Sequence, residues 1–371
     1  MNKNAIVFGF IILLFSSVYL VLSHERLMMD ERLHMNQITR FVHGDFTIST
    51  ELSMGPGYHL LLTPFGRILG TAPATLRLMQ LFISFAFLFI FWKTANLLDQ
   101  KYAKIKLLQV ALCPLLFPYY FLLYTDSLTL LLLVASFALV IKRRYGGAGL
   151  LASASLLVRQ TSIIWLGYIL LTAYVQERNA KKFATFFIGI AGFVLFIIIN
   201  GGVVTGAKSF QPVAPSINNI VLFLFLMFML FLPEHIARVR KYVFFLPGIL
   251  LVGLLLTSFF ANNHPWNQTP YFLRNQLLIW FSQDTSHKLL LFSLAGIQLV
   301  ALASQPLVTL FGMLSLGFIS LVEPRYGLPF LTFYLLTRSI PSVRAAYTTL
   351  PIFLFLSLYQ IWGLHTDRFF P

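Results

Sequence analysis

The chain has 371 residues, of which 58% are hydrophobic and only 11% are charged. An ordinary soluble domain carries about 25% charged residues, so the composition excludes a soluble globular protein. The net charge of +15 would suit a nucleic-acid-binding protein. However, the basic residues fall in short clusters between apolar runs rather than on one basic face, which argues against nucleic acid as a partner.

The first apolar run, Ala5–Leu22, predicts an uncleaved anchor helix, because no small-residue cleavage site follows it. Crossing a hydrocarbon core about 30 Å thick takes roughly 17 or more apolar residues. Further crossings are predicted at approximately 74–92, 107–123, 127–141, 147–159, 162–175, 183–202, 218–233, 242–260, 288–303, 306–322, 327–337 and 345–362. The pattern indicates an all-α polytopic membrane protein with about 13 transmembrane helices (11–14), forming one domain over residues 1–371.

The basic clusters predict which loops face which side, because cytoplasmic loops carry excess Lys and Arg. These clusters are Lys93–Lys106, Lys142–Arg144, Arg178–Lys182, Arg238–Lys241 and Arg338–Arg344. Placing them inside puts residues 23–71 and 261–287 in two large outer loops. Within the first loop, "PGYHLLLTPFGRILG" is short and contains Pro64, so an interfacial or re-entrant segment is expected.

The first outer loop holds a group of ionisable residues in "MDERLH". On a helix Asp30 and Glu31 point about 100° apart, and His34 shares a face with one or both. One carboxylate can then face a cleft while the other binds backbone or a basic residue. A general base that takes a proton from a hydroxyl needs this arrangement. The alternative is a solvated loop with scattered charges.

Four ionisable residues stand at the ends of apolar runs, where charges usually line a cavity or pair with each other. They are Asp126, Arg159, Glu323 and Arg325. In "RQT" a functional role and simple snorkelling to the interface are both open. In "EPRY" a structural ion pair and a substrate clamp are both open.

The second outer loop, "ANNHPWNQTPYFLRNQ", contains His264 and Arg274 among aromatic residues. Arginine binds phosphate through two donors, and aromatic rings pack on sugar faces. The alternative is an interfacial aromatic belt. Asn267-Gln268-Thr269 is formally an N-glycosylation acceptor, although Pro270 follows it.

Several kinds of chemistry have no motif in this chain. The only cysteine is Cys113, so no disulfide framework is expected. Zinc-ligand spacing, G-x-S-x-G and a phosphate loop are absent from the sequence, and neither a metal nor a cofactor is predicted. No internal repeat is found, which weakens a transporter interpretation.

Six short motifs appear in a fixed order: "MDERLH", "GPGY", "FPYYFLLYTDS", "VRQTSIIW", "NGGVVTGAKS" and "LVEPRYGLPFL". Together they resemble the dolichyl-phosphate-glucose α-1,2-glucosyltransferase family, from about Met28 to the C-terminus. Members of that family add the terminal glucose to the lipid-linked oligosaccharide precursor of N-glycosylation. Two features depart from the family pattern: a long charged cytoplasmic insertion is missing, and Glu51 stands where an aspartate is expected.

The resemblance implies a GT-C glycosyltransferase with its active site at the outer, lumenal face. The implied donor is a polyprenyl- or dolichyl-phosphate sugar, and the implied acceptor is a lipid-linked oligosaccharide. An acidic residue in the first outer loop would be the catalytic base. Asp30 and Glu31 match that position, with Glu51 as a competitor. A β-linked donor and an α-linked product would mean inversion in one displacement, which needs one essential carboxylate.

The remaining expected site residues would bind the donor phosphate or the substrates. They are His34, Asp126, Arg159, Gln160, His264, Arg274, Glu323, Arg325 and Tyr326. Arg274, Arg159 or Arg325 would neutralise the leaving phosphate, and an apolar groove between helices would hold the prenyl tail. The membrane would be that of the endoplasmic reticulum in a eukaryote and the plasma membrane in a prokaryote. Open alternatives are a transferase of another polyprenyl-phosphate sugar to a bacterial cell-envelope glycan, and a lipid or sugar transporter.

Overall fold

A computed structural model describes residues 3–206 and 214–371, and these residues form helices and connecting segments without a strand. The chain divides into two compact units. Unit 1 comprises Met1–Leu107 and Phe117–Gln211, and unit 2 comprises Leu108–Leu116 and Pro212–Pro371. The organisation as one domain stays a prediction.

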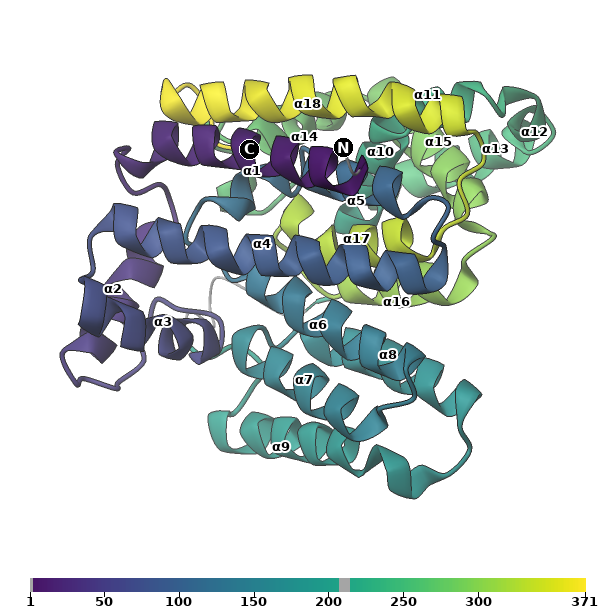
Figure 1. Cartoon of the computed structure of the whole chain (residues 1–371). Helices are drawn as coiled ribbons and strands as arrows, with labels where there is room; N and C mark the ends of the chain where they lie inside the picture. The colour runs from purple at the N-terminus through teal and green to yellow at the C-terminus, as the bar shows by residue number, and fades with distance from the viewer. Residues whose placement is uncertain (1–2, 207–213) are drawn as a thin grey trace. The chain divides into compact units, whose positions relative to one another are not determined.

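Unit 1 contains the first half of the helices, shown from purple to teal in Figure 1. They are α1 (Lys3–Ser23), α2 (Glu31–Val42), α3 (Gly57–Leu69), α4 (Pro73–Leu98), α6 (Asp126–Ile141), α7 (Tyr145–Val158), α8 (Ser162–Gln176) and α9 (Ala184–Asn200), with the 3-10 turns η1 (Phe117–Tyr120) and η2 (Ala180–Phe183). Helix α5 (Ala103–Ala111) crosses the boundary between the units.

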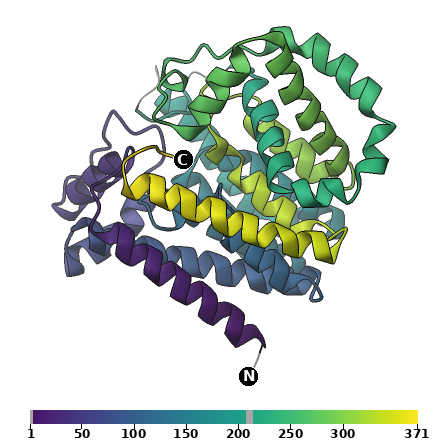
Figure 2. The ribbon, with the colours of Figure 1, turned by 90° about the horizontal axis from the view of Figure 1, so that it is seen from above.

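Unit 2 contains the remaining helices, shown from teal-green to yellow in Figure 2. They are α10 (Asn218–Leu230), α11 (Leu232–Ile236), α12 (Val239–Val243), α13 (Leu246–Leu256), α14 (Leu273–Ser282), α15 (Thr285–Leu302), α16 (Pro306–Leu316), α17 (Leu328–Thr337) and α18 (Val343–His365). Three 3-10 turns join them: η4 (Thr257–Phe259), η5 (Pro265–Asn267) and η6 (Pro324–Gly327). Helix α15 packs against both α10 and α13, and α11 packs against α18.

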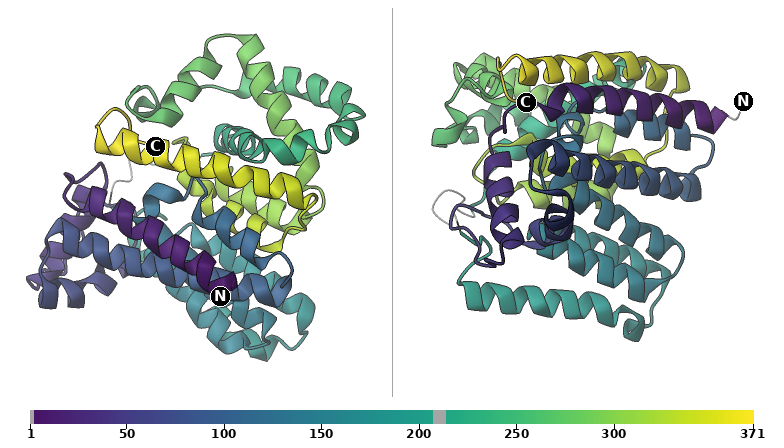
Figure 3. Two further views of the ribbon diagram at one scale, coloured as in Figure 1. Left: turned by 45° about the horizontal axis from the view of Figure 1, so that its top comes forward. Right: turned by 60° about the vertical axis from the view of Figure 1, so that its left-hand side comes forward.

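The helices of unit 1 form a succession of layers. Helix α4 packs on α6, α6 on α7, and α7 on α9, an order that is visible in Figure 1 and again from the side in Figure 3. Helices α2 and α3 pack against each other, and α3 contacts both α4 and α7. This pair carries the predicted first outer loop, so the stack holds the loop through α3.

Five described helices are long and apolar enough to cross a membrane: α1, α4, the segment Ala180–Asn200, α15 and α18. Six shorter apolar helices of 10–17 residues accompany them. The chain is a multi-pass membrane protein, as the composition predicts. The predicted boundaries of the first helix and of the last one agree with α1 and α18 to within three residues.

The predicted crossing at 107–123 is wrong as a single helix. Helix α5 ends at Ala111, and a buried irregular segment follows, because Pro114 and Pro118 lack the N–H groups that a continuous helix needs. Within unit 1, polar side chains of α4 bond the carbonyl oxygens that have no helical partner. Gln80 donates to the carbonyl of Tyr119 and Ser84 to that of Tyr120, each at 2.9 Å. A buried segment without helical bonds needs such partners.

Two other predicted crossings are interrupted. Helix α10 ends at Leu230, and the predicted crossing at 242–260 is divided among the end of α12, the 11-residue helix α13 and the turn η4. Pro233 and Pro247 each begin a new helix near its first position, where proline is tolerated, so both mark breaks. The segment that contains Pro64 is helix α3, and its interfacial placement stays a prediction.

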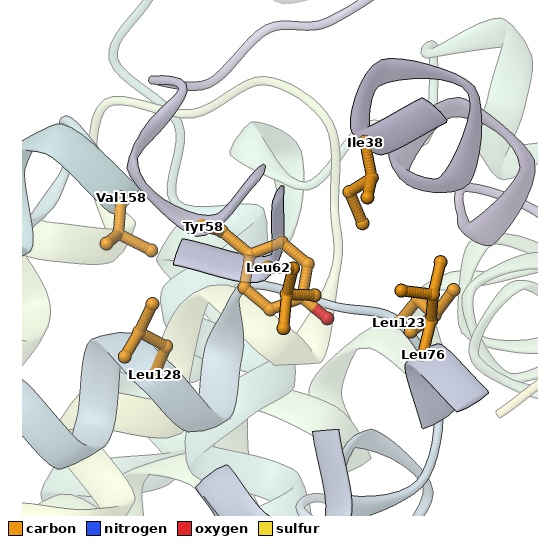
Figure 4. Close-up of a cluster of buried hydrophobic side chains, with 7 residues drawn as sticks. All are labelled: Ile38, Tyr58, Leu62, Leu76, Leu123, Leu128 and Val158. Carbon is orange, nitrogen blue, oxygen red and sulfur yellow. The ribbon is translucent and has the colours of Figure 1, made fainter. Parts of the chain in front are cut away.

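A cluster of buried apolar side chains joins α3 to its neighbours in unit 1, as Figure 4 shows around the ring of Tyr58. Its members come from α2, α3, α4, α6 and α7 and from the segment before α6: Ile38, Tyr58, Leu62, Leu76, Leu123, Leu128 and Val158. All of them are less than 9% exposed. Burying each such side chain stabilises the fold by about 1.5–3 kcal/mol, so the α2–α3 pair is fixed to the stack.

The glycines of "GPGY" allow the chain to approach the end of α7. A Cβ added to Gly55 would lie 2.3 Å from the carbonyl oxygen of Leu157, and one added to Gly57 would lie 2.8 Å from it. No ordinary side chain fits this distance, because the obstacle is backbone. The motif therefore holds the start of α3 against the residues just before Arg159.

We expect Gly55→Ala to lower the free energy of unfolding by about 1–3 kcal/mol, the usual cost of overpacking a well-filled contact. Denaturation of the purified protein in detergent would measure it. The matched control is Gly192→Ala on α9, where an added Cβ meets nothing within 4 Å. Equal stability of the two variants would contradict a close backbone contact at Gly55.

Candidate functional site

Glu31 is a buried carboxylate at the first position of α2, and both of its oxygens are occupied. Arg77 donates from Nε to Oε1 at 3.0 Å and from a terminal nitrogen to Oε2 at 2.6 Å. The backbone N–H of Met28 donates to Oε2 and that of Leu123 to Oε1, each at 2.9 Å. Glu31 and Arg77 are both 0% exposed. This is the carboxylate that binds backbone and a basic residue, as the pattern predicts for one of the pair.

Arg77 extends the same network to the end of α1. Its guanidinium also donates to the carbonyl oxygens of Leu22, Glu25 and Arg26. Sequence reasoning missed Arg77 as a functional neighbour of Glu31, although a charge three or four residues inside an apolar run is the usual signal of a buried partner. The pair fixes the turn between α1 and α2.

Asp30 lies at the surface end of that turn and is half-buried. Its predecessor, Met29, has a φ of +47°, a left-handed conformation that is uncommon outside glycine. The N–H of Glu31 bonds the carbonyl of Met28 at 3.0 Å, which closes the turn. Strained residues of this kind persist where surrounding contacts over-determine them, often at functional sites. The network of Glu31 supplies such contacts on both sides of Met29 and Asp30.

His34 lies one turn further along α2 and is fully buried. Its Nδ1 lies 2.9 Å from Nε2 of His59 on α3, and the two rings stack with centroids 5.2 Å apart. Tyr58 and Tyr124 place their rings against His34. Burial holds the pKa of His59 well below its usual range, and the contact between the two rings joins α2 to α3. His34 therefore faces away from solvent.

Glu51 is an exposed residue in the loop between α2 and α3. Gln37 organises this loop: its amide donates to the carbonyl of Thr47 at 2.9 Å and accepts from the N–H of Ser49 at 2.8 Å. The segment after Glu51 is held by the motif "NGGVVTGAKS", since the hydroxyl of Thr205 donates to the carbonyl of Leu52 at 2.9 Å. Residues 207–209 of that motif lie outside the described residues.

Asp126 and Arg159 form a buried ion pair at the ends of α6 and α7. Of the alternatives for these residues, mutual pairing is confirmed. Gln160 follows Arg159 and its amide contacts the carbonyl of Ser53 at 3.4 Å. Gln160 also borders a cavity of about 430 Å³ that is lined mostly by apolar residues of α7 and α9 and by Pro56. Within unit 1, "GPGY" and "RQT" therefore meet at one cavity.

In unit 2 two arginines surround one carboxylate. The Nε of Arg325 lies 2.7 Å from an oxygen of Glu323, and a terminal nitrogen of Arg274 lies 3.8 Å from the same oxygen. All three residues are less than 9% exposed. The ion pair in "EPRY" is thus confirmed, and Arg274 adds a second cation that the sequence places 49 residues away. The three groups leave a net charge of +1 in a buried place.

Two asparagines build this arrangement: Asn219, which sequence reasoning missed, and Asn267, which it named as a formal glycosylation acceptor. Asn219 at the start of α10 accepts from the N–H of Glu323 at 2.9 Å and donates to the carbonyl of Leu321 at 2.9 Å. Asn267 exchanges two bonds with the backbone of Val322, at 2.9 and 3.0 Å. Asn267 is 0% exposed, so the formal glycosylation acceptor is a buried structural residue. The sequence signal for Asn219 is that it stands at the start of an otherwise apolar run, where a polar side chain needs a hydrogen-bond partner.

The last two predicted residues lie at the edges of this group. His264 is half-exposed and accepts from the N–H of Trp266 at 3.2 Å, which caps η5. Tyr326 is half-buried, and its N–H bonds the carbonyl of Glu323 at 3.2 Å. Within the described residues no group of three or more His, Cys, Asp or Glu could hold a metal ion.

Comparisons with known proteins find a family model, curated relatives and a solved structure that are similar to this chain. A model described as the DIE2/ALG10 family matches residues 24–184. A relative from Debaryomyces hansenii, named Dol-P-Glc:Glc(2)Man(9)GlcNAc(2)-PP-Dol alpha-1,2-glucosyltransferase, is 35% identical over 136 residues, which are 34% of this chain and 27% of the relative. Proteins of the same name from Candida albicans and Candida glabrata are 27% and 26% identical. The resemblance that the motifs indicated is confirmed for residues 24–184, and its extension to the C-terminus stays a prediction.

These matches cover parts of longer proteins. The Candida albicans match covers 38% of this chain and 37% of that protein, and the Candida glabrata match covers 49% and 42%. The chain thus matches less than half the length of each of these relatives. The crystal structure of ArnT from Cupriavidus metallidurans bound to undecaprenyl phosphate is 13% identical, covers 99% of this chain and 79% of that chain, and aligns with a TM-score of 0.48.

Proposed function

We propose that this chain, which resembles the DIE2/ALG10 family over residues 24–184, is a membrane hexosyltransferase. It moves glucose from dolichyl-phosphate-glucose to a lipid-linked oligosaccharide and forms an α-1,2 linkage, as the names of its relatives describe. One observation carries the proposal. The residues that match the family include the turn before α2, where the Glu31 carboxylate accepts four hydrogen bonds and the neighbouring Asp30 is partly exposed.

The proposed fold is that of a GT-C enzyme with about 13 crossings, as expected from the hydropathy pattern. The loops 23–71 and 261–287 would face the lumenal or outer side, opposite the basic clusters. The compartment would be the endoplasmic reticulum in a eukaryote and the plasma membrane in a prokaryote.

Asp30 is the proposed general base. Its carboxylate accepts the proton of an acceptor-sugar hydroxyl, whose oxygen attacks the anomeric carbon of the donor glucose. The bond from that carbon to the phosphate oxygen breaks, and the electron pair leaves with the polyprenyl phosphate. A single displacement inverts the anomeric centre and needs one base. Glu31 cannot act in this way without giving up its bonds to Arg77 and the backbone, so it is assigned to holding the turn.

The donor phosphate is assigned to the arginines of unit 2 rather than to Arg159. Arg159 pairs with a carboxylate of its own, Asp126, whereas Arg274 and Arg325 both lie against the single carboxylate of Glu323. The Nε of Arg274 is buried and has no hydrogen-bond partner, while a terminal nitrogen donates to the carbonyl of Pro371 at 3.4 Å. A phosphate oxygen would accept a hydrogen bond from the Nε of Arg274, and the negative charge of the phosphate would complement the two arginines.

Two apolar cavities offer room for lipid chains. The unit 1 cavity of about 430 Å³ borders Gln160. In unit 2 a cavity of about 480 Å³ lies between α10, α13 and α15 and is lined almost entirely by apolar side chains. Either cavity suits part of a prenyl tail or a membrane lipid, because moving an apolar chain from the bilayer into an apolar cavity costs little free energy.

The proposed function is tested with the purified full chain in detergent, given dolichyl-phosphate-glucose and a synthetic glucose-capped lipid-linked oligosaccharide. Transfer of one α-1,2-linked glucose is expected. Transfer only from another polyprenyl-phosphate sugar would keep the reaction class and change the substrate. A protein that transports lipid or sugar across vesicles but transfers none would overturn the proposal.

We expect Arg274→Gln to raise the KM for dolichyl-phosphate-glucose by about tenfold or more, because a lost charge-assisted hydrogen bond costs about 1.5–3 kcal/mol. Initial rates over a range of donor concentrations measure this. The control is Arg344→Gln on α18, an exposed arginine outside the Glu323 group. A KM that does not change, with the thermal stability intact, would remove Arg274 from the donor site.

A further inference from the structure

A small polar cavity lies at the other end of α10 from Asn219, entirely within unit 2. Its volume is about 150 Å³, several times the roughly 10–15 Å³ that one water needs. The lining comes from α11, α12, the end of α15 and the segment after α17, and includes Glu234, His235, Arg238, Lys241, Tyr242 and Arg338. The proposed function uses none of these residues.

Glu234, the one acidic residue of the lining, is paired with Arg338. Arg338 donates to both oxygens of Glu234, at 3.0 and 2.9 Å, and to the amide oxygen of Gln109 at 2.8 Å. Arg338 is 2% exposed, and its guanidinium lies 4.4 Å from the ring of Phe231. Its Nε has no hydrogen-bond partner although the residue lines the cavity. A buried donor of this kind costs free energy unless a ligand or water satisfies it.

Two further cations line the same cavity without an acidic partner. Arg238 and Lys241 form no ion pair with the residues that the structure describes. His235 adds no charge, because burial lowers its pKa to about 4. Its ring nitrogens contact Tyr242 at 3.2 Å and Gln298 at 2.8 Å. Because the charges of Glu234 and Arg338 cancel, Arg238 and Lys241 give the lining a net charge of +2.

We propose that this cavity binds a phosphate group, supplied by the headgroup of an anionic lipid or by a soluble phosphate ester. A compact anion fits the volume, the +2 charge attracts it, and the unsatisfied Nε of Arg338 is a donor for one of its oxygens. Arginine and lysine together are the usual side chains of phosphate sites. The cavity is separated from Glu323 by α10, whose 13 residues span about 20 Å. It is therefore a second anion site, independent of the donor site.

The basic residues around the cavity belong to the clusters Arg238–Lys241 and Arg338–Arg344, which the sequence pattern places on the cytoplasmic side. Anionic lipids are enriched in that leaflet, and each nearby Lys or Arg contributes about 1 kcal/mol of attraction. A headgroup phosphate from that leaflet is the source that this placement favours.

The test uses the full chain reconstituted in phosphatidylcholine nanodiscs, with phosphatidic acid as the lipid probe and glycerol 3-phosphate as the soluble probe. Thermal-shift titration and native mass spectrometry report binding. The test variant is Arg238→Gln with Lys241→Gln, both at positions outside the buried ion pair. The control is Arg240→Gln with Arg344→Gln, which removes equal charge at exposed positions that do not line the cavity.

We expect the test variant to weaken phosphatidic acid binding by about tenfold or more, and the control to weaken it less than twofold. Competition by glycerol 3-phosphate would identify the phosphate ester itself as the ligand, and failure to compete would identify the membrane-anchored headgroup. Equal losses in the two variants would overturn the proposal in favour of diffuse surface attraction. No binding of either probe by the unmodified protein would also overturn it.

Discussion

Asp30→Asn is expected to slow glucose transfer by about a hundredfold or more, since a positioned general base contributes typically 10²–10⁴-fold. The amide keeps the size of the side chain but cannot accept the hydroxyl proton. Donor binding should be kept, and Tm should fall less than in Glu31→Gln, because Glu31 and Arg77 supply the buried ion pair that holds the turn. Steady-state kcat, donor affinity and Tm measure the three quantities.

Two variants in the same loop control this result. Asp45→Asn removes an exposed carboxylate that pairs with Arg40 at 2.8 Å and has no proposed catalytic role, so it should keep full activity. Glu51→Gln tests the competing base. Full activity of Asp30→Asn together with an inactive Glu51→Gln would move the base to Glu51.

Glu31→Gln is expected to lower the free energy of unfolding by about 3–5 kcal/mol, the usual cost of removing one partner of a buried ion pair. The neutral amide leaves the charge of Arg77 uncompensated and brings an N–H₂ group against donors that need an acceptor. Denaturant titration in detergent measures the loss, and Arg77→Met should show a loss of similar size.

The matched control is Glu177→Gln, which breaks an ion pair with Lys182 at the surface of the same unit. Surface pairs contribute little, so its stability should not differ measurably from that of the unmodified protein. A Glu31→Gln protein that is as stable as the control but inactive would reverse the assignment and make Glu31 the base.

The helices and the identity of the first-loop residues could be predicted from the sequence because both depend on local pattern. Apolar runs of sufficient length predicted α1, α4, α15 and α18, and the spacing in "MDERLH" predicted that its two carboxylates have different surroundings. Pro114 and Pro118 are the local signal that breaks the run 107–123, because neither can donate the N–H that a continuous helix needs.

The assignment of roles could not be predicted in this way, because it depends on partners far away in the sequence. Glu31 is bound by Arg77, 46 residues later, and by the N–H of Leu123, 92 residues later. Asn219 orders Glu323 across 104 residues. Periodicity specifies which face a side chain occupies and not which distant group meets it there.

The sequence by itself determined that the protein is a multi-pass membrane protein, and its ordered motifs indicated a resemblance to one glycosyltransferase family. These properties follow from composition, from the length of apolar runs and from short local patterns. Only the tertiary structure decided that Glu31 holds the turn while Asp30 reaches the surface, and that Arg274 joins Arg325 at Glu323. The physical reason is that a buried charge must find its partners in space, and packing alone determines which groups lie within hydrogen-bonding distance.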